Sequence, residues 1–333
     1  GLARIKSAKG LLTSQALSLP YYADADLAKW VRNTVERHDI SSVVAYSSPM
    51  AQYVMGPEFE SLRRIMDFVD VDSDKWDQYA AKKSWPMNWV YSRESRRLLE
   101  FERIVAREFD ASILVTDAEV ELFSRLAPES AAKVYAVPNG VSTDYFDPSF
   151  DLENPYPEGV RAVVFTGMMD YWANVDAVTW FAKEVFPAVR ASDPDAEFWI
   201  VGGSPTSEVE NLRKLESVKV TGRVPDVRPY LKYAACAVAP LRIARGIQNK
   251  VLEAMAMGCP VVCTTQAATG IGNPDSRPPL VISDDATEFA GETVRHLHQG
   301  RDSTSDMLTR DYAVEKHGWG QALDKFERVH AGL

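Results

Sequence analysis

The sequence predicts an α/β fold made of two Rossmann-like domains. Short apolar segments alternate with helical patterns along both halves of the chain. In the second half, three successive apolar segments end in glycine, at Gly167, Gly202 and Gly222. A length of 333 residues is large for one hydrophobic core and suits two. Residues 148–159 carry three prolines and little apolar content, which predicts a linker between the domains.

The first predicted domain covers residues 1–147. Its apolar segments of strand length are separated by longer amphipathic segments, the pattern of a parallel sheet with covering helices. The predicted strands are residues 42–46, 64–69, 112–115 and 133–137. The predicted helices are residues 25–37, a helix beginning near Pro49, 93–108 and 117–126. The pair Asn139-Gly140 is a turn signal that closes this half.

An acidic run, DVDSD at residues 70–74, follows the second predicted strand. A calcium loop is excluded, because its glycine and glutamate positions are taken by Lys75 and Ala81. A metal-binding Asp-x-Asp pattern says little, since the same pattern occurs twice elsewhere in the chain. Two interpretations stay open. The acids lie at the carboxyl end of a parallel strand, where α/β folds place their sites, or Ser73 or Asp74 caps a helix.

A segment rich in large apolar side chains comes next. Trp76, Trp85, Met87 and Trp89 lie on either side of Pro86. They could line a binding groove or belong to the core. Large aromatic residues are more often buried, so the core is the expected location.

The second predicted domain covers residues 160–309, and the tail covers residues 310–333. The predicted strands are residues 162–166, 197–201, 218–221, 237–239 and one opened by 260–262. The predicted helices are one capped by Asn174 and running to about residue 190, 207–216, 227–234 and 248–257. Gly258 follows the last of these as its C′ residue. The tail contains an amphipathic helical pattern at residues 321–329.

The junction before the helix at residues 248–257 is the strongest candidate site. Backbone N–H groups at a helix start favour anions, and Gly246 lets a ligand approach the backbone closely. Lysine and arginine add positive charge, and Glu253 can accept two hydroxyl hydrogens from a sugar. Together these features indicate a nucleotide or nucleotide-sugar site, although a solvated helix is the alternative. The residues concerned are Arg245, Gly246, Ile247, Gln248, Asn249, Lys250 and Glu253.

Longer motifs carry a resemblance to a known family. EAMAMGCPVV at residues 253–262 resembles the signature of retaining GT-B glycosyltransferases of family four. DFVDVDSDKW, VPNGVSTDYF, VFTGMMDYWANVDAVTWFA and APLRIARGIQNKVLEAMAMG are similar to the sugar transferases associated with PEP-CTERM/exosortase exopolysaccharide systems. This resemblance covers nearly the whole chain. It implies two Rossmann-like domains facing across a cleft and a C-terminal helix that crosses back to the first domain.

The resemblance also implies roles for particular residues. Glu253 would bind the ribose of a nucleotide-sugar, and the helix start with Lys250 would bind its diphosphate. Gly167 and Met168 would face the diphosphate or the donor sugar. Val224 would lie at the base. Asp70 is the nearest match to a site histidine of the family. The expected catalytic residues are Lys250, Glu253 and Asp70, and the expected donor-binding residues are Gly167, Met168, Gly202, Val224, Arg245, Gly246, Ile247, Gln248, Asn249, Lys250 and Glu253.

One position departs from the family pattern. Most members carry two glutamates eight positions apart, and the first position here is Arg245. The expected function is transfer of a sugar from a nucleotide-sugar to a glycan or lipid-linked acceptor in exopolysaccharide synthesis, with retention of configuration. The alternatives are a nucleotide-sugar 2-epimerase-like isomerase and a non-catalytic nucleotide-sugar-binding scaffold. No metal or other cofactor is expected.

Composition limits the classes of binding partner and the cellular compartment that we expect for the protein. A net charge of −10 and a pI of about 5.1 argue against nucleic-acid binding. Three cysteines without zinc spacing suit a reducing cytoplasm. Arg4, Lys6 and Lys9 give the acidic chain a basic start, which either contacts an anionic membrane surface or is an ordinary surface segment. No strand with a glycine-rich loop precedes residue 11, so we expect the first βα unit of the fold to be absent from this sequence.

Overall fold

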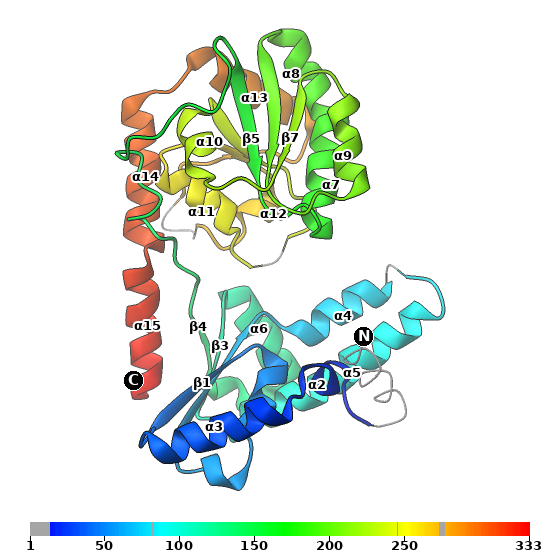
Figure 1. Ribbon diagram of the computed structural model, residues 1–333, viewed down its shortest axis with the longest axis vertical. Helices are drawn as coiled ribbons and strands as arrows, with labels where there is room; N and C mark the ends of the chain where they lie inside the picture. The colour runs from blue at the N-terminus through cyan, green and yellow to red at the C-terminus, as the bar shows by residue number, and fades with distance from the viewer. Residues whose placement is uncertain (1–13, 82, 245, 273–276) are drawn as a thin grey trace. The chain divides into compact units, whose positions relative to one another are not determined.

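The computed structural model describes residues 14–81, 83–244, 246–272 and 277–333 (Figure 1). The chain divides into two compact units. Unit 1 runs to Pro138 and also takes up Lys325–Leu333, whereas unit 2 is Asn139–Asp324. The last helix, α15 (Trp319–Ala331), therefore begins in unit 2 and ends in unit 1. Each unit contains one parallel sheet, as the sequence predicts.

The sheet of unit 1 has four parallel strands in the order β1-β2-β3-β4. Each strand is short, apolar and bounded by turn residues, and all lie within about two residues of their predicted positions. Because all four strands are parallel, their carboxyl ends share one edge. The strands are β1 (Ser42–Tyr46), β2 (Arg63–Val69), β3 (Ala111–Leu114) and β4 (Val134–Ala136).

Helices cover both faces of this sheet. One face packs on a cluster that includes Phe68, Phe109 and Phe123. On the other face, Ile65 and Ile113 pack with Val329 from α15. The helices are α2 (Ser18–Tyr22), α3 (Ala25–Arg37), α4 (Asp72–Ala81), α5 (Met87–Glu108) and α6 (Asp117–Leu126), with 3₁₀ turns η2 (Ser48–Tyr53), η3 (Pro57–Phe59) and η4 (Pro128–Lys133). The helix predicted near Pro49 is the 3₁₀ turn η2.

A buried carboxyl joins three of these elements. Glu102 of α5 is fully buried and accepts hydrogen bonds from Ser48 Oγ at 2.9 Å and from Ser73 Oγ at 2.5 Å. Burial raises the pKa of Glu102 to about 8. Ser73 is thus held inside α4 by a side-chain partner, which rules out the helix-capping role considered for it.

The sheet of unit 2 has six parallel strands in the order β10-β9-β8-β5-β6-β7. The strand order reverses direction at β5, so β5 and β8 lie at a switch point, where doubly wound sheets open a crevice at their carboxyl ends. The strands are β5 (Arg161–Thr166), β6 (Ala196–Val201), β7 (Val218–Gly222), β8 (Cys236–Ala239), β9 (Val261–Cys263) and β10 (Val281–Ile282).

The helices of unit 2 pack around a core of fully buried aromatic side chains. Phe181, Phe186, Phe198 and Phe289 contact one another at ring-centroid distances of 4.6–6.2 Å. The helices are α7 (Trp172–Trp180), α8 (Phe186–Ser192), α9 (Ser207–Asn211), α10 (Arg228–Tyr233), α11 (Asn249–Ala256), α12 (Thr265–Ala268), α13 (Ala286–Gln299) and α14 (Ser303–His317), with the π-helical turn η5 (Phe181–Val185) and the 3₁₀ turn η6 (Leu212–Lys214).

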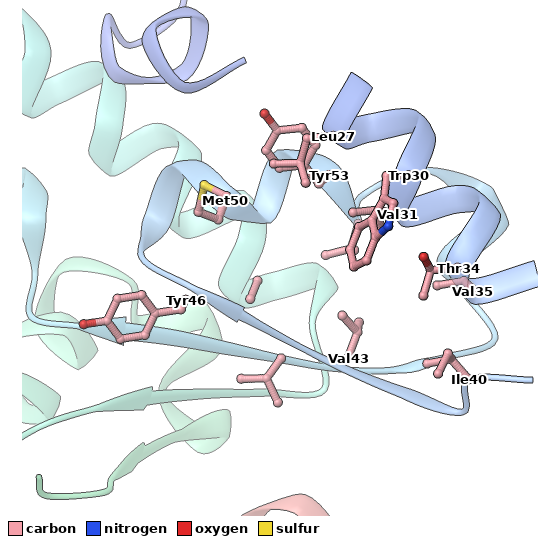
Figure 2. A pocket seen from close by; sticks show the side chains of 13 residues that line it. Leu27, Trp30, Val31, Thr34, Val35, Ile40, Val43, Tyr46, Met50 and Tyr53 are labelled. Atoms are coloured by element: carbon pink, nitrogen blue, oxygen red, sulfur yellow. The ribbon is translucent and has the colours of Figure 1, made fainter. Parts of the chain in front are cut away.

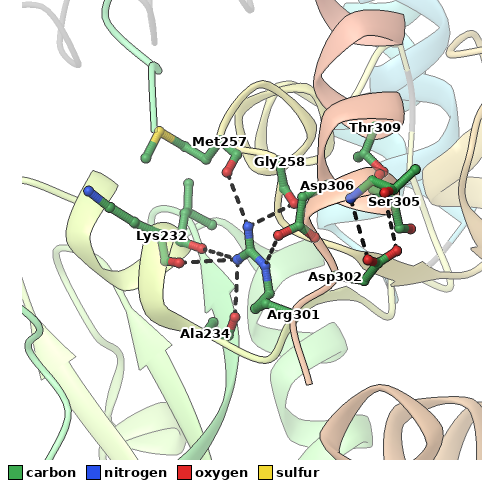
Figure 3. A network of polar contacts seen from close by, with 11 residues as sticks. Lys232, Ala234, Met257, Gly258, Arg301, Asp302, Ser305, Asp306 and Thr309 are labelled. Carbon is green, nitrogen blue, oxygen red and sulfur yellow. Dashed lines mark hydrogen bonds and ion pairs between the residues drawn. The ribbon is translucent and has the colours of Figure 1, made fainter. Parts of the chain in front are cut away.

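Arg301 fixes the carboxyl ends of two helices at once (Figure 3). Its guanidinium donates to Lys232 O at 3.1 Å and Ala234 O at 3.2 Å, at the end of α10. It also donates to Gly258 O at 2.8 Å, just beyond α11, and pairs with Asp306 at 2.7 Å. Carbonyl groups at a helix end lack partners within the helix, and a cation there is favoured by the helix dipole. Arg301 therefore anchors α11 from its far end.

The segment at residues 148–159, which the sequence analysis assigned as the linker, packs on unit 2. Lys232 Nζ donates to Phe150 O at 2.6 Å, and the buried Tyr156 donates from its hydroxyl to Tyr230 O at 2.7 Å. The boundary between the units falls at Pro138 and not after residue 147. Prolines here fix an extended path along α10, and composition alone does not separate such a path from a free linker.

Three of the aromatic-segment residues expected in the core are exposed instead. Trp85, Met87 and Trp89 are 80%, 41% and 53% exposed. The helix predicted from residue 93 begins at Met87, directly after Pro86, so Met87 and Trp89 lie in the first turn of α5 and Trp85 lies just before it. Trp76 is half-buried, with its ring packed on Tyr91.

Candidate functional site

Helix α11 presents its amino end to a crevice of unit 2. Gln248 precedes the helix as its N-cap, and Gly246 has a φ of +61°, in the left-handed region that favours glycine. Val251, Leu252 and Met255 are buried on the core side, as the sequence predicts. The N–H groups of the first turn have no carbonyl partner within the helix and point out of its positive end. The loop that leads to α11 is held by an ion pair between Arg242 and Asp176 of α7.

Two glycines bring strands β5 and β6 very close together beside α11. A Cβ on Gly202 would lie 1.7 Å from Gly167 O, and a Cβ on Gly167 would lie 2.8 Å from Asn174 Nδ2. Their φ values are +153° and +155°. Both positions therefore require glycine, and the backbone itself forms this wall of the crevice.

Lys250 is oriented by an asparagine from another helix. Its Nζ donates to Asn174 Oδ1 at 3.1 Å, and Asn174 Nδ2 donates to Met168 O at 2.8 Å. Asn174 is 4% exposed. It lies within α7, which begins at Trp172, so the prediction that it caps this helix is wrong. Its side chain instead links Lys250 to the loop after β5.

Burial sets the protonation of the two charged residues of α11. It lowers the pKa of Lys250 to about 8, opposed by the nearby negative charge of Glu253. It raises the pKa of Glu253, opposed by Lys250. An anion bound beside Lys250 would favour its charged form and raise its pKa again.

These residues line one open cavity of about 650 Å³, and all of its lining residues belong to unit 2. Its volume is in the range of small-molecule sites. Most of the residues predicted to bind the donor line it. They are Gly167, Met168, Gly202, Val224, Ile247, Gln248, Asn249, Lys250 and Glu253. Gly246 is not among the lining residues, and Arg245 lies outside the described residues.

Several lining residues were not predicted as site residues. Phe146, Tyr171 and Arg223 are the most distinctive of them, and Arg223 adds a second cation beside Val224. Asn174, which orients Lys250, is another, and the remaining ones are Thr166, Val201, Gly203 and Val227. The glycine ending β5 was the sequence signal for this side of the cavity, because the residues that follow such a glycine turn toward the ligand.

Asp70 belongs to unit 1. It follows β2, and its N–H donates to Phe68 O at 2.9 Å across a tight turn centred on Val69, whose φ is +69°. A β-branched residue rarely adopts this conformation. Asp70 also forms an ion pair with Lys75 at 2.8 Å. It lies at the carboxyl end of its strand, as predicted.

A second cavity, of about 480 Å³, lies in unit 1 between α3 and strand β1. Figure 2 shows Trp30 and Val31 of α3 pointing toward the strand, with Met50 and Tyr53 at one end. Its lining is almost wholly apolar, and none of the predicted site residues contributes to it. Among the described residues, no three His, Cys, Asp or Glu side chains are grouped so as to hold a metal ion.

Comparison with known proteins supports the same architecture. Residues 160–299 match the family model described as Glycosyl transferases group 1. None of the curated proteins compared with the chain is a significant match. The chain is similar to sucrose-phosphate synthase of Thermosynechococcus elongatus, at 17% identity and a TM-score of 0.66, covering 95% of this chain and 79% of that one.

Two further solved structures are similar. Alr3699/HepE of Anabaena, solved in complex with UDP, has 13% identity and a TM-score of 0.68, covering 93% of this chain and 83% of that one. WaaG, a glycosyltransferase involved in lipopolysaccharide biosynthesis, has 16% identity and a TM-score of 0.63, covering 94% and 82%. The chain therefore has the two-domain GT-B fold of these proteins, and its unit 2 carries the region that matches the glycosyl transferases group 1.

Proposed function

We propose that the protein is a glycosyltransferase that moves a sugar from a nucleotide-sugar to a glycan or lipid-linked acceptor. The observation that carries the proposal is the cavity of unit 2, where the amino end of α11, Lys250 and Glu253 converge. The match of residues 160–299 to a glycosyltransferase family model and the UDP bound by a protein of the same fold support it.

Each group in the cavity has a task in this proposal. The first-turn amides of α11 and Lys250 bind the diphosphate, while Glu253 accepts hydrogen bonds from the ribose hydroxyls. Val224 and Arg223 contact the nucleobase of the donor. As the glycosidic bond breaks, negative charge grows on the departing nucleoside diphosphate, and Lys250 and the helix dipole stabilise it there.

Retention of the anomeric configuration, a place in exopolysaccharide synthesis and a cytoplasmic location belong to the proposal too. The departing phosphate would accept the proton of the acceptor hydroxyl, which attacks on the same face of the sugar. Asp70 of unit 1 is proposed on the acceptor side. No metal takes part, because Lys250 and the helix amides supply the positive charge that a divalent cation would otherwise provide. Activity should then survive EDTA.

The test is thermal unfolding with UDP, GDP and ADP, for wild type and for Glu253→Ala. A ligand at one hundred times its dissociation constant stabilises the folded state by about 2.7 kcal/mol. We expect a shift with one nucleotide that the variant loses. The matched control is Glu158→Ala, since this exposed glutamate is not among the residues that line the cavity.

Turnover then separates the candidate functions. A labelled nucleotide-sugar consumed only when an acceptor is added supports transfer, and NMR of the product gives the anomeric configuration. Consumption without acceptor and with a new sugar epimer would replace the proposal by an isomerase. Binding of a nucleotide without any turnover would replace it by a scaffold. No shift with any nucleotide would refute the assignment of the cavity.

A further inference from the structure

The turn between α4 and α5 presents large apolar side chains to solvent. Trp85, Met87 and Trp89 are 80%, 41% and 53% exposed. Single exposed apolar residues are ordinary, but two tryptophans and a methionine so close in the chain form a patch that the packing of unit 1 does not use. We call residues 83–89 the hairpin tip.

The hairpin tip is supported by the packing of α4 against α5. Helices α4 and α5 run side by side up to their connection (Figure 1). Trp76 and Tyr79 of α4 pack on Tyr91 of α5, with ring centroids 5.2 Å and 6.4 Å apart. The exposed side chains are therefore held at the end of a packed pair of helices, and docking them costs little ordering of the backbone.

Positive charge gathers around the tip although the whole chain carries −10. Lys83 and Arg96 are exposed, whereas Arg93 is buried and Arg97 pairs with Glu100 at 2.7 Å. The one acidic residue among residues 83–97, Glu94, is 2% exposed and accepts a hydrogen bond from Ser18 N at 3.0 Å. No acidic residue lies in the first turn of α5, whose positive end is at the tip. Arg96 follows Trp89 by two helical turns on the same face, roughly 10 Å away along the axis.

We propose that the hairpin tip docks unit 1 on a lipid bilayer that carries anionic headgroups. Tryptophan rings are favoured at the level of the headgroups, and lysine and arginine are attracted by the surface potential of an anionic leaflet. Trp85 and Trp89 enter the interface with Met87, while Lys83 and Arg96 contact the lipid phosphates. A carbohydrate-binding surface fits less well, because residues 83–89 contain no carboxylate to accept sugar hydroxyls.

The proposal does not depend on glycosyl transfer, because it rests on unit 1 alone. The test is flotation of the full chain with vesicles of phosphatidylcholine and with vesicles of equal parts phosphatidylcholine and phosphatidylglycerol. The wild type should bind the second kind, less tightly at high salt. The double variant Trp85→Ser/Trp89→Ser should lose more than about tenfold in partitioning. Lys83→Gln should lose about fivefold.

The matched control is Trp30→Ser, because Trp30 is a tryptophan of unit 1 that is 62% exposed away from the tip. It should partition like the wild type, and the variants at the tip should unfold at the wild-type temperature. Absence of binding to anionic vesicles refutes the proposal, as does an equal loss in the Trp30 variant. Quenching of wild-type tryptophan fluorescence by a soluble oligosaccharide, without vesicle binding, would make the tip a carbohydrate surface instead. Nucleotide-induced stabilisation of the double variant should be unchanged.

Discussion

Replacing Gly202 by alanine tests whether the close approach of β5 and β6 builds the site. The added Cβ would lie 1.7 Å from Gly167 O, so the two groups must separate by roughly 2 Å to reach ordinary contact. Both glycines are held by main-chain bonds, with Gly167 N donating to Val201 O at 3.0 Å and Gly202 N to Gly222 O at 3.2 Å. The sheet therefore opposes this movement.

The cost has two parts. Overpacking a rigid site costs roughly 1–3 kcal/mol, and a left-handed φ costs a residue with a Cβ roughly 1–2 kcal/mol. Gly202→Ala should then destabilise unit 2 by roughly 2–5 kcal/mol. For a unit of this size, that lowers Tm by roughly 4–20 °C. Movement of Gly167 also displaces Met168 O, which orients Asn174 and through it Lys250, so stabilisation by a nucleotide should be lost.

The assay is thermal unfolding with and without the nucleotide that stabilises the wild type. Gly203→Ala is the matched control, because the nearest atoms to a Cβ there belong to the flexible Met168 side chain, at 3.6 Å. This control should unfold near the wild-type temperature, and it serves for stability alone because Gly203 also lines the cavity. The reasoning is refuted if the Gly202 variant unfolds with the control, since the two strands would then separate without cost.

Three further predictions concern single side chains. Nucleotide binding should weaken as pH rises through about 8, because burial lowers the pKa of Lys250 to about 8 and the lysine loses its charge above it. Calorimetry across this pH range measures the affinity. Lys250→Gln should bind the nucleotide weakly at every pH. Burial raises the pKa of Glu102 to about 8, so the folded state binds the proton more tightly than the unfolded state does. The free energy of unfolding should therefore fall between about pH 4.5 and 8, by at most roughly 1.4 kcal/mol per pH unit, and urea titrations of Glu102→Gln should lack this fall. Arg301→Ala removes the donor to five carbonyl groups at the ends of α10 and α11 and leaves Asp306 without this cation. It should cost roughly 1–3 kcal/mol in urea unfolding, and a variant as stable as wild type would show that water replaces the guanidinium.

Short sequence patterns correctly predicted the helix and the strands that surround the cavity of unit 2. The helix at residues 248–257 is α11 within one residue at each end, because Gly246 and Gly258 bracket an apolar periodicity that only a helix satisfies. Nine of the ten strands were predicted for a similar reason, since each is a short apolar run with turn residues on both sides. The two-residue strand β10 (Val281–Ile282) was not predicted, because so short a segment has no recognisable pattern.

Features that depend on distant parts of the chain were not predictable in this way. Asn174 was taken for a helix cap, but its partner Lys250 is far away in sequence and meets it only in the folded unit. The exposure of Trp85 and Trp89 follows from a turn between two helices, and hydrophobicity argues in the opposite direction. The packing of residues 148–159 on α10 depends on Tyr156 reaching a carbonyl of that helix.

The discontinuity of unit 1 has a consequence for how the chain is made. Synthesis proceeds from the amino terminus, and domains tend to fold as they emerge. Val329 and Phe326, which cover Ile65 and Ile113, leave the ribosome only after the whole of unit 2. The chain of unit 2 is complete at Asp324, so the unit that is synthesised first is the last to complete its core. Deletion of residues 325–333 would therefore remove part of the core of the amino-terminal sheet and leave the residues that line the cavity of unit 2 in place.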